Sequence, residues 1–323
     1  MNKQQGGRQL GATLRGLLGA NPPDGLSVAE REQIERLVDR YYRHVALDDI
    51  DEYEPQDLLG AVIAHWRLLR NRKPEQIKVR VYNPIQEEDG WCSRDTIVEI
   101  VSRDMPFLVD SMSAAINRQG QTVRLTFHPI IEVERDTAGQ LTRIVDEASD
   151  TSASAEAVIR LHVDRQPADA LEQLRASIVS VIEDVVTTTS DWLKMRRQAE
   201  KAMTLLSAQP DQGLGGAVEE YRHFLSWVIN DHFLFIGTCR FVCESLGDET
   251  TLRFEAASGR GLLGDGEQAE ERALAWIAGL EAGEVELGDG RGQVVAARPG
   301  EFQELGGHFR ADNVQAIVAG PGV

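Results

Sequence analysis

The 323-residue sequence predicts an α+β fold with three successive parts. Apolar residues recur at helical spacing in two segments before residue 70. A strand, a helix and a second strand follow one another between residues 96 and 128, and short apolar strands return after residue 232. The predicted parts are a flexible tail at 1–26, a helical hairpin plus a strand at 27–92, a βαββαβ unit at 93–190, connecting helices at 191–230, and a truncated α+β domain at 231–323.

The first 26 residues are expected to form a flexible tail. The first twenty contain three basic residues, no acidic residue and several glycines. Four leucines lie at helical spacing: Leu10, Leu14, Leu17 and Leu18. A helix that docks on a partner subunit is therefore an alternative, but the glycines favour a frayed end.

Two amphipathic helices are predicted to form the hairpin. Ser27 and Glu30 have the spacing of a capping box, in which each side chain bonds the backbone N–H of the other residue. The apolar stripe of the first helix is Ile34, Leu37, Val38, Tyr41 and Val45, and that of the second, after Pro55, is Leu58, Val62, Trp66 and Leu69. A strand at 77–82 follows the hairpin.

The central unit opens with an apolar strand, Ile97–Val101, which is typical of a strand buried on both faces. Asp104 is the expected N-cap of the next helix, and Pro106 suits its first turn. Strands at 122–128, 131–133, 141–145 and 159–163 and a helix from 171 to 185 complete the unit. The hydroxyl side chains of Thr187–Ser190 predict a break, with a new helix from Asp191.

The last part is predicted to hold short strands at 233–241, 251–256 and 293–297, after a linker at 209–216. A helix is expected at 267–278. The sequence stops just after the apolar run Ala316–Ala319, which we interpret as the end of a segment of a longer protein.

The acidic charge balance limits the expected partners. The chain has 52 acidic and 34 basic residues, for a formal net charge of −18, which disfavours nucleic acid and membrane lipid as partners. No apolar run is long enough to span a bilayer, and the N-terminus lacks the apolar core of a signal peptide. Three cysteines form no disulfide framework, so we expect a cytoplasmic protein.

No catalytic, cofactor-binding or metal-binding residues are predicted. The glycine-rich stretches at 213–216, 259–261 and 288–292 lack the spacing and context of a dinucleotide-binding turn. Cys239 and Cys243 have no two further zinc ligands nearby and are expected to be buried thiols. His128 and His162 lie on the polar faces of strands that are expected to be neighbours. A metal or general-base role is the alternative to two surface histidines.

The turn between the first strand and the first helix of the central unit is the candidate ligand site. Backbone N–H groups at a helix N-terminus attract a carboxylate, and Asp104 or Asp110 can bond an amino group, so an amino acid suits the turn. The alternative is that Asp104 is only an N-cap and Asp110 a surface or interface residue. The candidate residues are Asp104, Met105, Pro106, Phe107, Leu108, Val109 and Asp110.

Several motifs share one resemblance. They are Tyr41–Val45, Ala64–Arg67, Arg80–Pro84, Trp91, Asp104–Ser111, Asn117–Gly120, His128–Pro129, Trp227–Gly237 and Ser258–Gly264. Together they resemble the N-terminal regulatory region of the large bacterial NAD-dependent glutamate dehydrogenases, over most of residues 35–265.

The resemblance implies a parent enzyme that deaminates L-glutamate to 2-oxoglutarate and ammonia with NAD. It implies an ACT-like βαββαβ unit followed by a PAS-like domain, with the catalytic domains far downstream. The segment itself is then inactive and binds no cofactor. Its implied partners are the downstream domains, the other subunits of a homo-oligomer and an amino-acid effector.

One position departs from the usual ACT pattern. Ligand-binding ACT domains commonly have a glycine in the strand–helix turn, whereas Pro106 or Phe107 stands there in this sequence, and Phe107 can fill the pocket. Two alternatives therefore stay open. One is a structural oligomerisation module without a ligand, and the other is a stand-alone amino-acid sensor that is complete at residue 323.

Overall fold

The computed structural model describes residues 3–43, 45, 49–145, 153–208 and, with gaps, 222–264, 271, 293–296 and 313–321. Its helices and strands belong to two units, Met1–Glu183 and Asp184–Val323, and helix α6 (Leu171–Ala208) contributes to both. The combination of helices with antiparallel sheets confirms the predicted α+β class.

An antiparallel sheet forms the centre of the first unit, with strand β6 in its middle. In sheet order the strands are β1 (Lys78–Tyr82), β2 (Thr96–Arg103), β6 (Ser154–Val163), β4 (Ile130–Arg135) and β5 (Leu141–Val145), and β3 (Val123–Phe127) also pairs with β6. One side of β6 pairs with β2, and the other side pairs with β4 and then with β3. β6 thus has strand neighbours on both sides, and its side chains are buried from residue 156 to residue 163, on both faces of the sheet.

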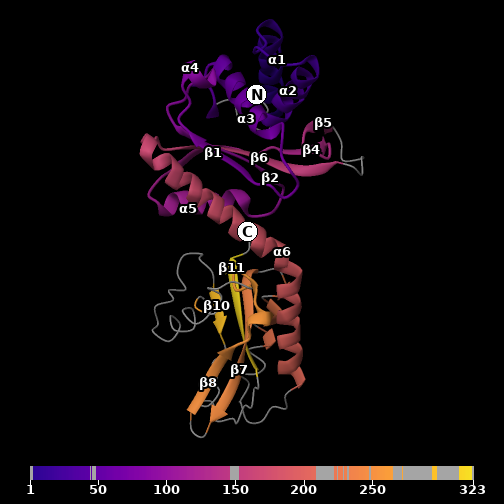
Figure 1. Cartoon of the computed structure of the whole chain (residues 1–323), viewed down its shortest axis with the longest axis vertical. Coiled ribbons are helices and arrows are strands. Elements are labelled where there is room, and N and C mark those ends of the chain that lie inside the picture. Colours follow the sequence, from indigo (N-terminus) through magenta and orange to yellow (C-terminus); the bar gives the residue numbers. More distant parts are fainter. Residues whose placement is uncertain are drawn as a thin grey trace. The chain divides into compact units, whose positions relative to one another are not determined.

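Helices cover both faces of this sheet (Figure 1). Helices α1 to α3 lie on one face, and α5 with the first part of α6 lies on the other. The helices before α6 are α1 (Lys3–Ala20), α2 (Val28–Tyr41), α3 (Pro55–Leu69), the single turn α4 (Gln86–Asp89) and α5 (Leu108–Arg118).

The order of elements agrees with the βαββα part of the predicted βαββαβ unit. The last strand of that predicted unit is where the structure differs. No strand after the second helix of the unit joins this sheet among the described residues. Strand β1, which precedes β2 in the chain, pairs with β2 instead, from Lys78 opposite Val101 to Tyr82 opposite Ile97. The predicted boundary at residue 93 therefore cuts through one continuous sheet, and the hairpin and the sheet share a core.

The predicted N-terminal tail is wrong, because residues 3–20 form helix α1. Leu14 and Leu18 are completely buried against α2 and α3, and Leu10 and Leu17 are partly buried there. The leucine spacing thus indicated a helix correctly, and the partner that stabilises it is the hairpin of the same chain. The predicted capping box is confirmed, since Glu30 N–H donates to Ser27 Oγ at 3.2 Å and Ser27 N–H donates to Glu30 Oε2 at 3.0 Å.

The break predicted at Thr187–Ser190 is also wrong, because α6 is continuous over its 38 residues. The Thr189 hydroxyl donates to the carbonyl of Val185 at 2.8 Å, one turn earlier in the helix. This bond satisfies the hydroxyl within the helix, so it does not compete with the helical backbone as a cap would.

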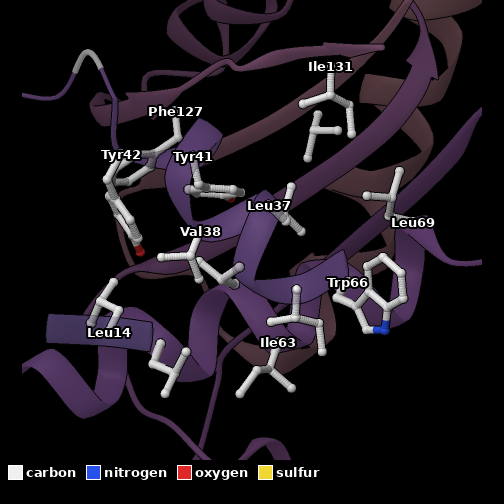
Figure 2. Close-up of a cluster of buried hydrophobic side chains, with 14 of the residues drawn as sticks. Leu14, Leu37, Val38, Tyr41, Tyr42, Ile63, Trp66, Leu69, Phe127 and Ile131 are labelled. Atoms are coloured by element: carbon white, nitrogen blue, oxygen red, sulfur yellow. The ribbon is translucent and has the colours of Figure 1, made fainter. Parts of the chain in front are cut away.

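The core of the first unit lies between the sheet and helices α1 to α3. Figure 2 shows side chains from all three helices meeting residues of the sheet, among them Leu14, Val38, Ile63 and Ile131. Tyr41, Tyr42 and Phe127 form an aromatic group at one side of this core, with ring centroids 5.3 to 5.6 Å apart. Burial of these apolar surfaces is the main stabilising term for the sheet–helix packing.

The second unit contains a separate antiparallel sheet, with the order β10-β11-β7-β8 and β9 beside β7. Its strands are β7 (Phe233–Leu246), β8 (Glu249–Phe254), β9 (Arg260–Gly261), β10 (Gln293–Ala296) and β11 (Asn313–Pro321). Three of them confirm the strands predicted from the sequence, and the apolar run Ala316–Ala319 lies in β11. The predicted linker at 209–216 and, apart from residue 271, the predicted helix at 267–278 lie outside the described residues.

The glycine-rich motif Ser258–Gly264 forms a tight turn against β7 and α6. Gly261 has a φ of 60°, and a Cβ at this position would lie 2.4 Å from the carbonyl oxygen of Ile236. Its N–H donates to Asp191 Oδ2 at 3.0 Å. Glycine is therefore required here for backbone geometry and close approach to the strand.

Gly60 permits a close approach between α3 and the segment that precedes β2. A Cβ at Gly60 would lie 2.5 Å from the Cβ of Trp91, whose side chain is almost completely buried. The same contact is supported by Asp57, which accepts a hydrogen bond from the Cys92 N–H at 2.9 Å. Because residue 60 has no side chain, Trp91 can pack directly against α3.

We predict that Gly60→Ala destabilises the first unit by about 1–2 kcal/mol, because the steric conflict with Trp91 exceeds the gain in helix propensity. The matched control is Gly16→Ala, at a helical glycine of α1 with no atom within 4 Å of the added Cβ. This control should stabilise by about 0.5–1 kcal/mol. Urea unfolding measures both changes, and a stabilising Gly60→Ala would contradict the packing described.

Candidate functional site

The predicted ligand turn connects the end of β2 to the start of α5. The Asp104 N–H donates to the carbonyl of Ala155 at 3.1 Å, which fixes the turn to the beginning of β6. The prediction that Asp104 is the N-cap is wrong. Phe107 is the N-cap residue of α5, and no side chain caps that end. Pro106 accordingly lies before the helix and not in its first turn.

Phe107 has a left-handed backbone, with a φ of 69°. For a residue with a Cβ this conformation costs about 1–2 kcal/mol relative to the right-handed region. The turn thus keeps the backbone geometry that favours glycine, although phenylalanine occupies the position. Of the two residues considered for the glycine position of ACT domains, Phe107 is the one with this left-handed backbone.

The residues of the turn differ in exposure. Met105 and Leu108 are buried and anchor the turn, whereas Pro106 and Asp110 are exposed. The other three, Asp104, Phe107 and Val109, are half-buried. Asp104 and Asp110 therefore present carboxylates at or near the surface.

His128, which follows β3, joins these carboxylates at the same end of the sheet. Desolvation lowers the pKa of His128, and the negative charges of Asp104 and Asp110 oppose that shift. The structure thus brings an imidazole close to the two acidic residues that the sequence singled out. His162, which the sequence placed on a polar face, is instead 2% exposed and lies apart from this turn in a second group of polar residues.

That second group, here called the polar layer, is buried between the sheet and helices α2 and α3. Its members are Tyr41, Tyr42, His65, Tyr82, Trp91, Glu99, Arg160 and His162. The sequence analysis did not identify it as a site. The available signals were a charged residue inside each of two apolar runs, Glu99 within Ile97–Val101 and Arg160 within Val158–Leu161. Strand register places these two residues directly opposite each other on β2 and β6.

Arg160 lies among aromatic rings and is 1% exposed. Its Cζ is 4.5 Å from the ring centroid of Phe127, 4.7 Å from that of Tyr41 and 5.7 Å from that of Trp91. These faces attract the guanidinium through cation–π interactions. Arg160 Nη2 also donates to the Tyr42 hydroxyl at 3.2 Å, and that hydroxyl donates to the carbonyl of Leu58 at 2.8 Å.

His65 connects α3 to α2 and to the sheet. Its Nε2 lies 3.2 Å from the carbonyl oxygen of Ile100, and its Nδ1 lies 2.8 Å from the Tyr41 hydroxyl. Because a carbonyl only accepts, Nε2 carries the proton and Nδ1 accepts from Tyr41. Burial lowers the pKa of His65 to about 3, and the nearby positive charge of Arg160 acts in the same direction.

His162 contacts Asp95 and Tyr53 through its Nδ1 atom. Nδ1 lies 3.2 Å from the Tyr53 hydroxyl and 3.4 Å from Asp95 Oδ2. Burial lowers the pKa of His162 to about 4, although its hydrogen bond to Asp95 partly offsets the effect. Both buried histidines are therefore neutral at neutral pH.

Glu99 completes the polar layer on strand β2. Its Oε1 accepts a hydrogen bond from the Tyr82 hydroxyl at 3.1 Å. Burial raises the pKa of Glu99 to about 7, against the opposing effects of Arg160 and Arg80. The carboxyl group is thus largely protonated below neutral pH, and Arg160 is the main fixed charge of the layer.

Other chemistry is limited in the described part of the chain. No group of three or more His, Cys, Asp or Glu residues there is arranged to hold a metal ion. Cys92 is exposed and Cys239 is buried, while the side chain of Cys243 lies outside the described set. None of the described helices is long and apolar enough to cross a membrane.

Comparison with known proteins relates the first unit to one enzyme family. Residues 37–178 match the family model described as glutamate dehydrogenase, ACT1 domain. Over 209 residues, 64% of this chain, the sequence is 36% identical to the NAD-specific glutamate dehydrogenase of Halomonas elongata. Over 232 residues, 71% of this chain, it is 30% identical to the enzyme of the same name from Pseudomonas aeruginosa. These alignments cover 13% and 14% of the two relatives, so the chain corresponds to a small part of them.

The backbone at residue 107 allows a test of the turn. Phe107→Gly and Phe107→Ala both remove the half-buried ring, but only alanine keeps a Cβ in the left-handed conformation. We therefore predict that the glycine variant is more stable than the alanine variant by about 1 kcal/mol. Urea unfolding of the two variants measures the difference. At helical position 16 the order should reverse, with Gly16→Ala more stable than the wild-type glycine. Equal stability of the two residue-107 variants would contradict a left-handed turn.

The buried His162 predicts how stability depends on pH. Its folded pKa of about 4 lies below the ordinary value of about 6.5, so the unfolded chain binds a proton first as pH falls. The contribution of neutral His162 to the free energy of unfolding is therefore fully present above about pH 6.5. It decreases by roughly 3 kcal/mol as the pH falls to 4.

His162→Gln keeps a hydrogen-bonding side chain and does not titrate, so its unfolding free energy should fall less steeply over this range. The measurement is urea unfolding at a series of pH values. His128→Gln, at an exposed histidine whose pKa desolvation lowers less, is the comparison and should change the slope less than His162→Gln does. Equal slopes for wild type and His162→Gln would show that His162 is not buried in its neutral form.

Proposed function

With residues 37–178 belonging to the ACT1 domain family of glutamate dehydrogenases, we propose that this chain is a regulatory and assembly segment of an NAD-dependent glutamate dehydrogenase. The parent reaction converts L-glutamate, NAD and water to 2-oxoglutarate, ammonia and NADH. The match of the sheet and its helices to the ACT1 family is the observation that carries the proposal. The segment corresponds to about one-seventh of its relatives and leaves catalysis to the rest of the parent chain.

We further infer that the segment acts through an amino-acid effector bound at the strand–helix turn. The support is the combination of left-handed backbone at Phe107, the first N–H groups of α5, and the nearby carboxylates of Asp104 and Asp110. An amino acid presents a carboxylate to the helix N-terminus and an ammonium group to the two acids. The other partners in this proposal are the catalytic domains of the same chain and further subunits in a cytoplasmic homo-oligomer.

A structural oligomerisation module is the alternative from a different functional class. The observation that favours it is the side chain of Phe107, which stands where a glycine would leave room for a ligand. In that case the turn is closed and residues 1–323 pair subunits without responding to metabolites. We propose a PAS-like domain for residues 231–323 under either alternative, with the antiparallel sheet of the second unit as its support.

We predict that one or a few of the twenty amino acids raise the unfolding temperature of residues 1–323. At a hundredfold excess over the dissociation constant, the expected stabilisation is about 2.7 kcal/mol. Asp104→Asn should remove the shift, whereas Asp169→Asn, at an exposed acid outside the turn, should keep it. Differential scanning fluorimetry provides the measurement.

The same samples distinguish the alternative and test the lack of catalysis. Light scattering that shows self-association without any amino-acid shift would favour the structural module. Incubation with glutamate and NAD should produce no NADH, and detectable NADH formation by the purified segment would contradict a purely regulatory role.

A further inference from the structure

The polar layer contains an acid and a base that face each other without being joined. Glu99 on β2 and Arg160 on β6 are directly opposite in the strand register, where the Cβ atoms of opposed residues lie about 4.5–5.5 Å apart. Both side chains are buried, with 0% and 1% exposure. Among the described residues, the guanidinium donates one hydrogen bond, to the Tyr42 hydroxyl, and Glu99 accepts one, from the Tyr82 hydroxyl.

Unused hydrogen-bonding atoms remain on both members of this pair. Nε and Nη1 of Arg160 and Oε2 of Glu99 have no partner in the described part of the chain. A guanidinium presents its N–H groups in a fork that matches a carboxylate. The facing residue therefore carries an acceptor for the unused donors of Arg160. A direct bond requires only new side-chain rotamers, because the register already opposes the two residues.

A second set of contacts competes for the same guanidinium. Arg160 Cζ lies 4.5 Å from the ring centroid of Phe127 and 4.7 Å from that of Tyr41, and Nη2 donates to the Tyr42 hydroxyl at 3.2 Å. These neutral groups hold the cation when no charged partner competes. A neutral carboxyl group attracts a guanidinium weakly, whereas a buried carboxylate attracts it strongly. Ionisation of Glu99 therefore favours the direct bond.

We propose that Arg160 is a two-position switch. Its guanidinium stays on Tyr42 and the aromatic rings while Glu99 is protonated, and it bonds the Glu99 carboxylate once Glu99 is ionised. In the second position the Tyr42 hydroxyl loses its bond from Arg160 and keeps the bond to the carbonyl of Leu58. Ionisation thus releases a connection between the central strand and the end of α2. The switch lies apart from the strand–helix turn, so it does not depend on amino-acid binding there.

Glu99 is the group of this layer that changes charge near neutral pH. Burial raises its pKa to about 7, although the positive charges of Arg160 and Arg80 oppose the shift. Burial lowers the pKa of His65 to about 3 and that of His162 to about 4, so both histidines are neutral there. Burial also raises the pKa of each nearby tyrosine, which stays protonated. The charged and titratable groups that face the pair are Arg80 and Tyr82 from β1, Asp89 from α4, Tyr41 and Tyr42 from α2, Tyr53 before α3, His65 from α3 and His162 from β6.

The test is an NMR pH titration of residues 1–323, from about pH 6 to about pH 8, across the Glu99 pKa. It observes the Arg160 Nε–H resonance and the side-chain carboxyl carbon of Glu99, which Arg160→Lys and Glu99→Gln assign. We expect both resonances to titrate with one midpoint, and the Arg160 resonance to stay fixed in Glu99→Gln. Arg135 is the internal control, because its Nε already donates to Glu156 at 2.7 Å. Its resonance should not move.

Two matched variants separate the switch from a simple titration of Glu99. Tyr42→Phe and Tyr82→Phe each remove one hydroxyl group and keep the ring. Tyr42→Phe removes the acceptor of the first position, so the midpoint should fall by about half a pH unit. Tyr82→Phe removes the hydrogen bond that favours ionised Glu99, so the midpoint should rise by a similar amount.

The proposal is overturned if the Arg160 resonance stays fixed over this pH range, whether or not Glu99 titrates. It is also overturned if Tyr82→Phe raises the midpoint while Tyr42→Phe leaves it unchanged. That second result would show that Arg160 keeps a single position and only senses the charge of Glu99.

Discussion

A guanidinium buried in the middle of the sheet is the constraint on which the first unit depends. Arg160 lies on the central strand and is 1% exposed, so every element that packs over it must stabilise a charge without solvent. Three different parts of the chain supply aromatic faces for this purpose: Tyr41 at the end of α2, Phe127 at the end of β3, and Trp91 before β2. The aromatic residues of this core therefore fill volume and stabilise the cation at the same time.

A second buried charge on β6 shows what a fully paired arrangement looks like. Glu156 lies four residues before Arg160 and receives hydrogen bonds of 2.7 Å from Arg72 and from two nitrogens of Arg135. Arg135 also donates to the carbonyls of Leu69 and Gly139, so the cluster ties the end of α3 to the β4–β5 hairpin. Glu156 on β6 thus lies between two arginines, whereas Arg160 faces Glu99 on β2 and is surrounded by aromatic rings.

Sequence patterns predicted the elements better than their partners. Capping chemistry is local, so the Ser27 start of α2 was predicted correctly, and alternation found the strands. The tail was wrong because the burial of Leu14 depends on α2 and α3, which are distant in sequence. The N-cap at Asp104 was wrong because the left-handed residue before α5 is Phe107, and no glycine marks the turn. The polar layer was missed because opposing residues are set by strand register, which local spacing does not specify.

The position of the sheet also restricts how an oligomer can form. Helices cover both faces, so the open sides lie along β1, β3 and β5, each of which has a single strand partner among the described residues. At β1, Lys78 donates through Nζ to the carbonyls of Leu68 and Asn71, and at β5 the N–H of Leu141 donates to the carbonyl of Arg70 at 2.8 Å. The segment after α3 therefore occupies part of the β5 edge, and at β1 the charged Lys78 side chain discourages strand addition. In the proposed homo-oligomer, the surfaces open to subunit pairing are therefore the outer surfaces of the helices and turns and the uncovered parts of the β1 and β3 edges. The strand–helix turn, with its exposed Pro106 and Asp110, belongs to those surfaces, so under the proposed function a ligand bound there would influence assembly.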